Sequence, residues 1–270
     1  MSTWDSRRRP VPGLPAASSG VAASADLAAT FRNLCRSSPW KWQSLRFEYW
    51  DQAFDSAPAP GAPFVRAWLR RPGALRLESP GGLVLHTTTG INDSRDVLYV
   101  SATRKSWLLP PSLVTPVYDG DGLVRRRPEA AYGEPGFGNG RFSAALDPVE
   151  LAGNAPVPIE FPGSNALDLR ELRYAGHEGR PALEAVAVPN VAYRPTDPAA
   201  PLCLPGMSRL RIDAATGVCV SSQSLEEATG EYGHWIHIIA VDEYMPDDLF
   251  LAESMNPTDV RRHVSWDIPA

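Results

Sequence analysis

Phe64–Thr89 reads FVRAWLRRPGALRLESPGGLVLHTTT, and this stretch decides the fold class. It holds three short runs in which apolar and polar residues alternate, separated by Arg-Pro-Gly at 71–73 and Ser-Pro-Gly-Gly at 79–82. Proline presets the backbone angle φ and glycine supplies positive φ, so both breaks are typical of turns. The stretch therefore predicts a three-stranded antiparallel meander.

Alternating runs of the same kind lie on both sides of the meander. Most are bounded by Gly, Pro, Asn or Asp, as short strands joined by tight turns are. Together they predict a mainly β (α+β) chain of about eight to ten mostly antiparallel strands and little helix. The expected strands outside the meander are residues 42–50, 97–101, 167–174, 181–188, 208–213, 218–222 and 234–243.

One longer helix is expected near the N-terminus. Ser24 suits its N-cap, and an apolar stripe of helical spacing follows. The helix is expected to end near Cys35, because Ser-Ser-Pro at 37–39 breaks the pattern. Shorter helical turns are expected at residues 147–151 and 245–250.

Composition favours a β-rich globular protein. Among 270 residues, 27 prolines and 21 glycines suit many short strands and turns. A formal net charge of -5 argues against a general nucleic-acid binder, which would normally carry a basic face. No apolar run reaches the length of about 18 residues that a membrane-spanning helix needs. No nucleic-acid partner and no integral membrane segment are therefore expected.

The sequence contains no motif for a metal or a cofactor. P-loop, GxGxxG, GxSxG, HExxH and EF-hand patterns are all absent. Cys35, Cys203 and Cys219 lie far apart and form no CxxC or Cys/His cluster, so neither a metal nor a cofactor is expected. Buried free thiols in a reducing compartment are favoured, with one Cys203–Cys219 bridge as the alternative.

The two ends of the chain are expected to lie outside the globular part. Residues 1–24 are rich in Pro, Ser, Ala and Gly, as a disordered leader is. Prolines stand where the apolar part of a signal peptide would begin, so a cytoplasmic location is expected. A single domain is expected over residues 25–250, with an irregular insertion at about 107–140 and a tail at 251–270.

Three short motifs together resemble a known family. Trp68–Glu78 reads W-x-R-x-P-G-x-x-R-x-E, Ile212–Val218 reads IDAATGV, and Val241–Phe250 reads VDEYMPDDLF. In this order, behind an N-terminal helix and strand, they resemble the lipoprotein-carrier (LolA-like) half-barrel family. Its relatives include periplasmic regulators of envelope-stress sigma factors and mycobacterial lipid-binding lipoproteins. The resemblance spans roughly residues 25–250, without the signal peptide that family members usually carry.

The resemblance implies a curved antiparallel half-barrel of about 8–11 strands wrapped around a few short helices. In that family the sheet encloses an apolar cavity for acyl chains. The resemblance therefore implies non-catalytic binding of a hydrophobic small molecule or lipid, driven by burial of apolar surface. The insertion would then act as a lid or as an extra wall of the cavity.

Aromatic side chains supply most of the candidate ligand-binding residues. Small-molecule sites commonly have aromatic walls with a few polar groups. The alternative is that these side chains belong to an ordinary hydrophobic core. The candidates are Trp50, Phe64, Arg66, Trp68, Tyr99, Trp107 and Trp235.

Histidines and carboxylates on expected strands supply candidates for acid–base catalysis. His234 and His237 point to opposite faces of one strand, so they do not share one metal ion. If a polar face lines the cavity, a buried imidazole or carboxyl can move a proton. The alternative is cross-strand ion pairing with nearby arginines on a solvated face. The candidates are His237, His86, Glu48 and Glu78.

Three functions follow from these observations. The first is the non-catalytic ligand binding that the resemblance implies, and the second is a cytoplasmic natural-product cyclase or isomerase in the same cavity. The third is a protein-interaction regulator whose insertion is the docking loop, in which Arg125–Arg127 is either solvated or contacts a phosphate or an acidic partner. An all-apolar cavity favours the carrier, a buried histidine or carboxylate in the cavity favours the enzyme, and a filled barrel with an exposed apolar patch favours the regulator.

Overall fold

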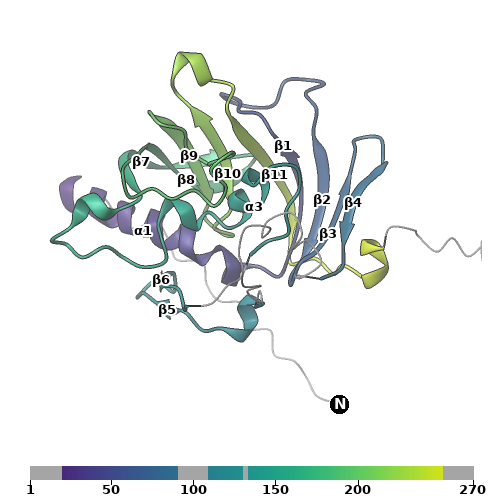
Figure 1. Cartoon of the computed structure of the whole chain (residues 1–270), viewed down its shortest axis with the longest axis horizontal. Coiled ribbons are helices and arrows are strands. Elements are labelled where there is room, and N and C mark those ends of the chain that lie inside the picture. Colours follow the sequence, from purple (N-terminus) through teal and green to yellow (C-terminus); the bar gives the residue numbers. More distant parts are fainter. Residues whose placement is uncertain (1–19, 91–108, 130–132, 252–270) are drawn as a thin grey trace, which may run out of the picture.

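The computed structural model describes residues 20–90, 109–129 and 133–251, with the backbone alone for residues 20–25. Nine strands form one antiparallel sheet in the order β4-β3-β2-β1-β11-β10-β9-β8-β7 (Figure 1). The strands are β1 Ser44–Trp50, β2 Val65–Arg70, β3 Ala74–Glu78, β4 Val84–Thr88, β7 Leu167–His177, β8 Arg180–Pro189, β9 Ser208–Asp213, β10 Cys219–Ser224 and β11 Gly233–Val241.

Short helices and one small hairpin complete the described chain. The hairpin consists of β5 Val117–Tyr118 and β6 Val124–Arg126. The helices are α1 Gly20–Lys41, α3 Arg141–Leu146 and the 3-10 helices η1 Pro111–Leu113, η2 Val149–Leu151, η3 Pro162–Ser164, η4 Glu227–Thr229 and η5 Asp247–Phe250.

The sheet consists of two meanders, and the first strand of one pairs with the last strand of the other. Strands β1 to β4 follow one another on one side, β7 to β11 follow one another on the other, and β1 pairs with β11 in the middle. The sheet curves over α1 and α3 (Figure 1). This confirms the predicted fold class, a mainly β chain with a large curved antiparallel sheet and few helices.

The stretch Phe64–Thr89 folds as the predicted meander. In β2 and β3, Ala67 lies opposite Leu77 and Leu69 opposite Leu75, and all four side chains are buried. The turns place Gly73 and Gly82 at φ of 85°, a conformation that glycine adopts at little cost. The expected strand at residues 97–101 lies outside the described residues.

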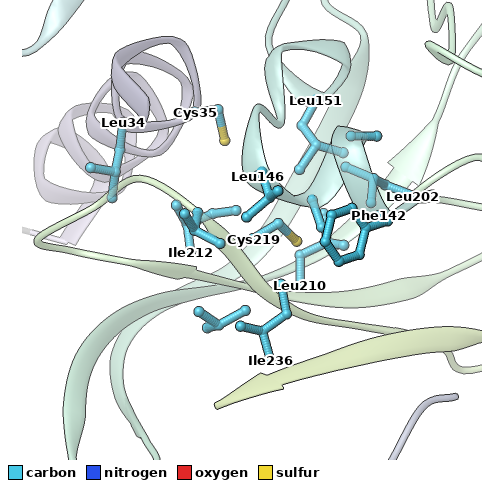
Figure 2. Packing of buried hydrophobic residues seen from close by; sticks show 14 of the residues in the cluster. Leu34, Cys35, Phe142, Leu146, Leu151, Leu202, Leu210, Ile212, Cys219 and Ile236 are labelled. Atoms are coloured by element: carbon cyan, nitrogen blue, oxygen red, sulfur yellow. The ribbon is translucent and has the colours of Figure 1, made fainter. Parts of the chain in front are cut away.

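The concave side of the sheet is filled by side chains. Figure 2 shows Leu34 and Cys35 of α1 and Phe142 and Leu146 of α3 packed over the sheet. Sheet residues of this cluster include Leu45, Phe47, Ala67, Leu69, Leu75, Leu77, Leu183, Ala185, Leu210, Ile212, Cys219, Ile236 and Ile238. Packed interiors leave few voids, so this part of the concave face is a core, not an open cavity.

Helix α1 is longer than predicted, since it runs past Pro39 to Lys41 and does not end near Cys35. Proline lacks an N–H, so the main-chain oxygen four residues earlier, that of Cys35, loses its helical partner. That oxygen accepts a hydrogen bond from Nη2 of Arg127 at 3.4 Å. In addition, Oγ of Ser38 donates to the main-chain oxygen of Leu146 at 2.5 Å. Tertiary contacts therefore compensate for the proline in the last turn.

The described part of the insertion is more regular than predicted. The Asp119–Gly122 turn closes the β5–β6 hairpin, and Oδ1 of Asp119 accepts from the main-chain N–H groups of Asp121 and Leu123. Helix α3 directly follows the glycine-rich segment and was not predicted, because six residues are too few for a clear helical period. The three cysteines are buried free thiols, as favoured.

Candidate functional site

Most predicted acid–base residues lie on the outer face of the sheet, opposite the packed helices. Glu48 lies opposite Arg66 on β2 and opposite His237 on β11. Its carboxylate is 3.6 Å from Nε of Arg66 and 3.5 Å from Nδ1 of His237. Glu78 pairs with Arg76 at 2.7 Å. The structure thus assembles Glu48, Arg66 and His237 as one cross-strand charge cluster.

The predicted aromatic residues divide into separate groups. The rings of Trp50 and Phe64 pack at 5.0 Å between centroids, at the ends of β1 and β2. Trp235 is buried, packs against His177 at 4.2 Å and donates from Nε1 to Glu178. Trp68 packs on a small cluster that includes Met245 of the C-terminal segment. Two further candidates, Tyr99 and Trp107, lie outside the described residues.

His86 differs from the other acid–base candidates because it faces the inner side. It lies opposite Leu77, and its ring is 6.3 Å from the ring of Phe137. Nε2 of His86 is buried and has no hydrogen-bond partner among the described residues. A buried polar atom without a partner is uncommon in folded proteins and is a candidate contact for a bound group.

Two hollows have Phe137 as a common lining residue, and we call them together the Phe137 cleft. The first encloses about 240 Å3 and is lined by Tyr49, Asp51, Gln52, Pro63, Phe64, Val65 and Phe137. The second encloses about 270 Å3 and is lined by His86, Gly136, Phe137, Gly138, Asn139, Gly140 and Asp197. The cleft therefore brings together Phe64 and His86, two of the residues predicted from the sequence.

The segment that carries Phe137, residues 133–140, is here called the glycine loop. At its start Glu134 pairs with the buried Arg71 guanidinium, 2.5 Å away. At its end the N–H of Gly140 donates to Oδ2 of Asp197 at 3.1 Å. A Cβ atom at Gly140 would overlap the Asp197 side chain, so this close approach requires glycine. The loop is thus tied down at both ends, with Phe137 between the ties.

A charged network borders the cleft at the end of β1. Asp51 accepts hydrogen bonds from Tyr49, Asn139 and Arg141, at distances of 3.0, 2.8 and 2.8 Å. Nη1 of Arg141 also donates to the main-chain oxygen of Gly233, which fixes the guanidinium. Burial and the nearby Asp51 carboxylate hold the pKa of the Tyr49 hydroxyl well above its usual value, so this side chain is a neutral donor.

Asp51 and Arg141 also line a third hollow, of about 670 Å3. Arg141 is buried, and its Nε has no hydrogen-bond partner among the described residues. Its guanidinium lies 4.0 Å from the Tyr232 ring centroid. The remaining lining residues are Glu227, Ala228, Thr229, Gly230, Glu231 and Tyr232.

Several groups at this site were not singled out from the sequence. Phe137, Asp51 and Arg141 belong to segments without a strand period, so alternation could not place them. The Gly-Phe-Gly-Asn-Gly run at residues 136–140 was the available signal, because glycines around one aromatic residue permit close approach of other groups. Within the described ranges, no three His, Cys, Asp or Glu side chains form a group that could hold a metal ion. No helix in this part of the chain is long and apolar enough to span a bilayer.

Comparisons with known proteins find similarity only among solved structures. No protein-family model and no curated protein matches the sequence. Similar solved structures include MucB alone, MucB in complex with MucA(peri), and the Pseudomonas aeruginosa MucA/MucB complex. Their sequence identities to this chain are 15%, 12% and 13%, with TM-scores of 0.34, 0.30 and 0.29.

The matches cover 85%, 80% and 84% of this chain but only 64%, 55% and 60% of those structures. This chain thus spans less than two thirds of the length of the proteins it matches. Similarity at these TM-scores carries no conclusion about activity or partner. The fold class rests on the strand order and the core described above.

Proposed function

We propose that this chain is a non-catalytic binding protein for a small, partly apolar molecule held in the Phe137 cleft. The observation that carries the proposal is the position of the Phe137 ring, which lines both hollows of the cleft. An aromatic side chain that lines both hollows offers a large apolar contact to a ligand. The ties at Glu134 and Gly140 favour a preformed site.

The two hollows differ in chemistry, which suggests the ligand class. The first hollow is lined by Phe64, Tyr49 and Val65, and the second is lined by His86 and Asp197. A ligand with a ring-sized apolar body and a polar group at one end would satisfy both. Binding sites for drug-sized molecules usually enclose about 300–1,000 Å3. Each hollow, of about 240 or 270 Å3, is smaller than this range, so each suits a compact group better than a long acyl chain.

Native mass spectrometry of the chain purified from its own host, followed by titration of the co-purified compound, tests the proposal. Phe137→Ala should weaken binding about tenfold or more, because it removes the shared wall. Phe161→Ala is the matched control, since Phe161 is exposed in another loop. Equal affinities for the two variants would contradict the cleft, and loss of binding in Trp68→Ala alone would move the site to the outer face.

A second candidate function, acid–base catalysis in the same cleft, is favoured by His86. Its unpartnered Nε2 lies beside a hollow that Asp197 also lines. An imidazole within reach of a bound ligand can transfer a proton to or from it. His86→Gln should then abolish turnover of the co-purified compound while its affinity changes by no more than about threefold. If the wild-type chain leaves the compound unchanged, the protein is a binder only.

A further inference from the structure

A groove on the insertion has features that the Phe137 cleft does not explain. It is formed by Val117 of β5, by Arg125 and Arg126 of β6, and by residues 155–159, and it encloses about 530 Å3. We call it the hairpin groove. The β5–β6 hairpin, which supplies one wall of this groove, lies on the side of α1 that faces away from the large sheet (Figure 1). The groove is therefore separate from the Phe137 cleft, and it belongs to the outer surface of the insertion.

The floor of the hairpin groove is apolar and exposed. Ile159 is 93% exposed and Val117 is 57% exposed. Residues 155–159 read Ala-Pro-Val-Pro-Ile and form one wall of the groove. The two prolines restrict the backbone of this wall. Clustered exposed apolar side chains beside polar ones mark surfaces that another molecule covers. A rigid wall loses little conformational entropy when a partner binds, so less free energy is lost on binding.

The rim of the groove is basic, although the chain as a whole is acidic. Arg125 and Arg126 are exposed, and their guanidinium groups form no ion pair or hydrogen bond with another described residue. The next residue, Arg127, is buried and pairs with Asp147. Its N–H also donates to the main-chain oxygen of Asn154 at 2.8 Å. Arg127 thus anchors β6 to the 155–159 wall, which leaves its two neighbours free at the rim.

We infer that the hairpin groove binds an extended segment of a partner protein in which acidic side chains alternate with apolar ones. Two free guanidiniums select carboxylates, and Val, Pro and Ile side chains select apolar groups between them. Nucleic acid fits less well, because the groove is lined by no aromatic ring for base stacking and the chain carries a net charge of -5. The inference is independent of the Phe137 cleft, since the two sites share no residue.

Selection of displayed random peptides on the full chain tests this inference. Counter-selection against the double variant Arg125→Glu/Arg126→Glu removes peptides that bind elsewhere. We expect the enriched peptides to combine Asp or Glu with aliphatic residues. For the best synthetic peptide, the double variant should raise the Kd about tenfold or more, measured by fluorescence anisotropy. Ile159→Ser should also weaken binding, and the lysine pair Arg125→Lys/Arg126→Lys should retain most of it.

The matched control is Arg170→Glu, because Arg170 is an exposed arginine of β7 outside the groove. It should leave the Kd unchanged, and all variants should keep the melting temperature of the wild type. Enriched peptides without acidic residues, or an unchanged Kd in the double variant, would overturn the inference. Self-association that the double variant abolishes would also overturn it, because the occupant would then be a second copy. The double variant should leave binding of the small molecule in the Phe137 cleft intact.

Discussion

Arg71 and Glu134 form an ion pair in the interior, with 2.5 Å between Nη2 and Oε1 and side chains only 3% and 4% exposed. Nη1 of Arg71 also donates to the main-chain oxygens of Ser38, Pro39 and Trp42. These oxygens lie at the C-terminal end of α1, where a cation is favourable. One guanidinium therefore joins the turn of the meander, the end of the helix and the glycine loop.

Removing the charge of Glu134 should strongly destabilise the fold. Glu134→Gln leaves the Arg71 guanidinium buried without its counter-ion, which typically costs about 3–5 kcal/mol. Denaturant unfolding measures the loss. Glu243→Gln is the control, because Glu243 pairs with Arg46 at the surface, where such pairs contribute about 0–1 kcal/mol. Similar decreases in the free energy of unfolding in the two variants would show that the buried pair stabilises the fold no more than the surface pair does.

Gly140→Ala should weaken ligand binding in the Phe137 cleft. The new Cβ would overlap Asp197, so either the glycine loop or the segment around Asp197 must move. Overpacking of this kind costs about 1–3 kcal/mol. Gly163→Ala is the control, because a Cβ at Gly163 meets no other atom within 4 Å. Ligand titration should give a higher Kd, and thermal unfolding a lower melting temperature, for Gly140→Ala than for Gly163→Ala. Equal values for the two variants would contradict the predicted overlap with Asp197.

Two buried histidines should make the protein less stable in mild acid. Burial lowers the pKa of His177 to about 4 and that of His234 to about 3. In the unfolded chain both titrate near the ordinary value of about 6.5. Between these values the unfolded state binds more protons, so the free energy of unfolding decreases as the pH falls from about 6.5 toward 3.

Urea unfolding at about pH 7 and about pH 5 measures this effect. His177→Gln should reduce the difference between the two conditions, because it removes one of the titrating groups. His237→Gln is the control, since His237 lies on the outer face of the sheet beside Glu48. A free energy of unfolding that is the same at both pH values would contradict the prediction.

The three cysteines should resist thiol reagents in the folded protein. All are buried, and burial raises the pKa of the Cys35 thiol to about 12 and those of Cys203 and Cys219 above their usual range. The thiolate is the reactive form, so both access and ionisation are suppressed. A colorimetric thiol assay should detect no fast reaction in buffer and full reaction in denaturant. Fast labelling in buffer would show that this core opens readily.

Local patterns were sufficient to predict the sheet. In the meander, alternation and two glycine turns specify strand positions, because side chains of a strand alternate between faces and only glycine adopts positive φ at little cost. The same reasoning located the hairpins that contain Ser208–Asp213 and Leu167–His177. It was wrong about the end of α1, because the bond from Arg127 to the Cys35 oxygen comes from distant sequence.

The candidate site depended much more on tertiary structure. Alternation assigned Glu48 and His237 to one face of their own strands, but only the pairing of β1 with β11 places them side by side, and only helix packing shows that this is the outer face. His86 and Phe64 come from different strands and approach Phe137 because the glycine loop is tied to Arg71 and Asp197. Such ties join residues far apart in the chain, so no local period records them.

The amino-acid sequence by itself determined that Phe64–Thr89 is a meander within a mainly antiparallel sheet, since its turns and alternation act over a few residues. The tertiary structure decided which face of that sheet is filled. It also decided that the Arg71 side chain at the first turn lies inside the protein, where it holds α1 and Glu134. Burial of a charge depends on partners supplied by other segments, and that is the physical reason why the order of residues alone does not reveal it.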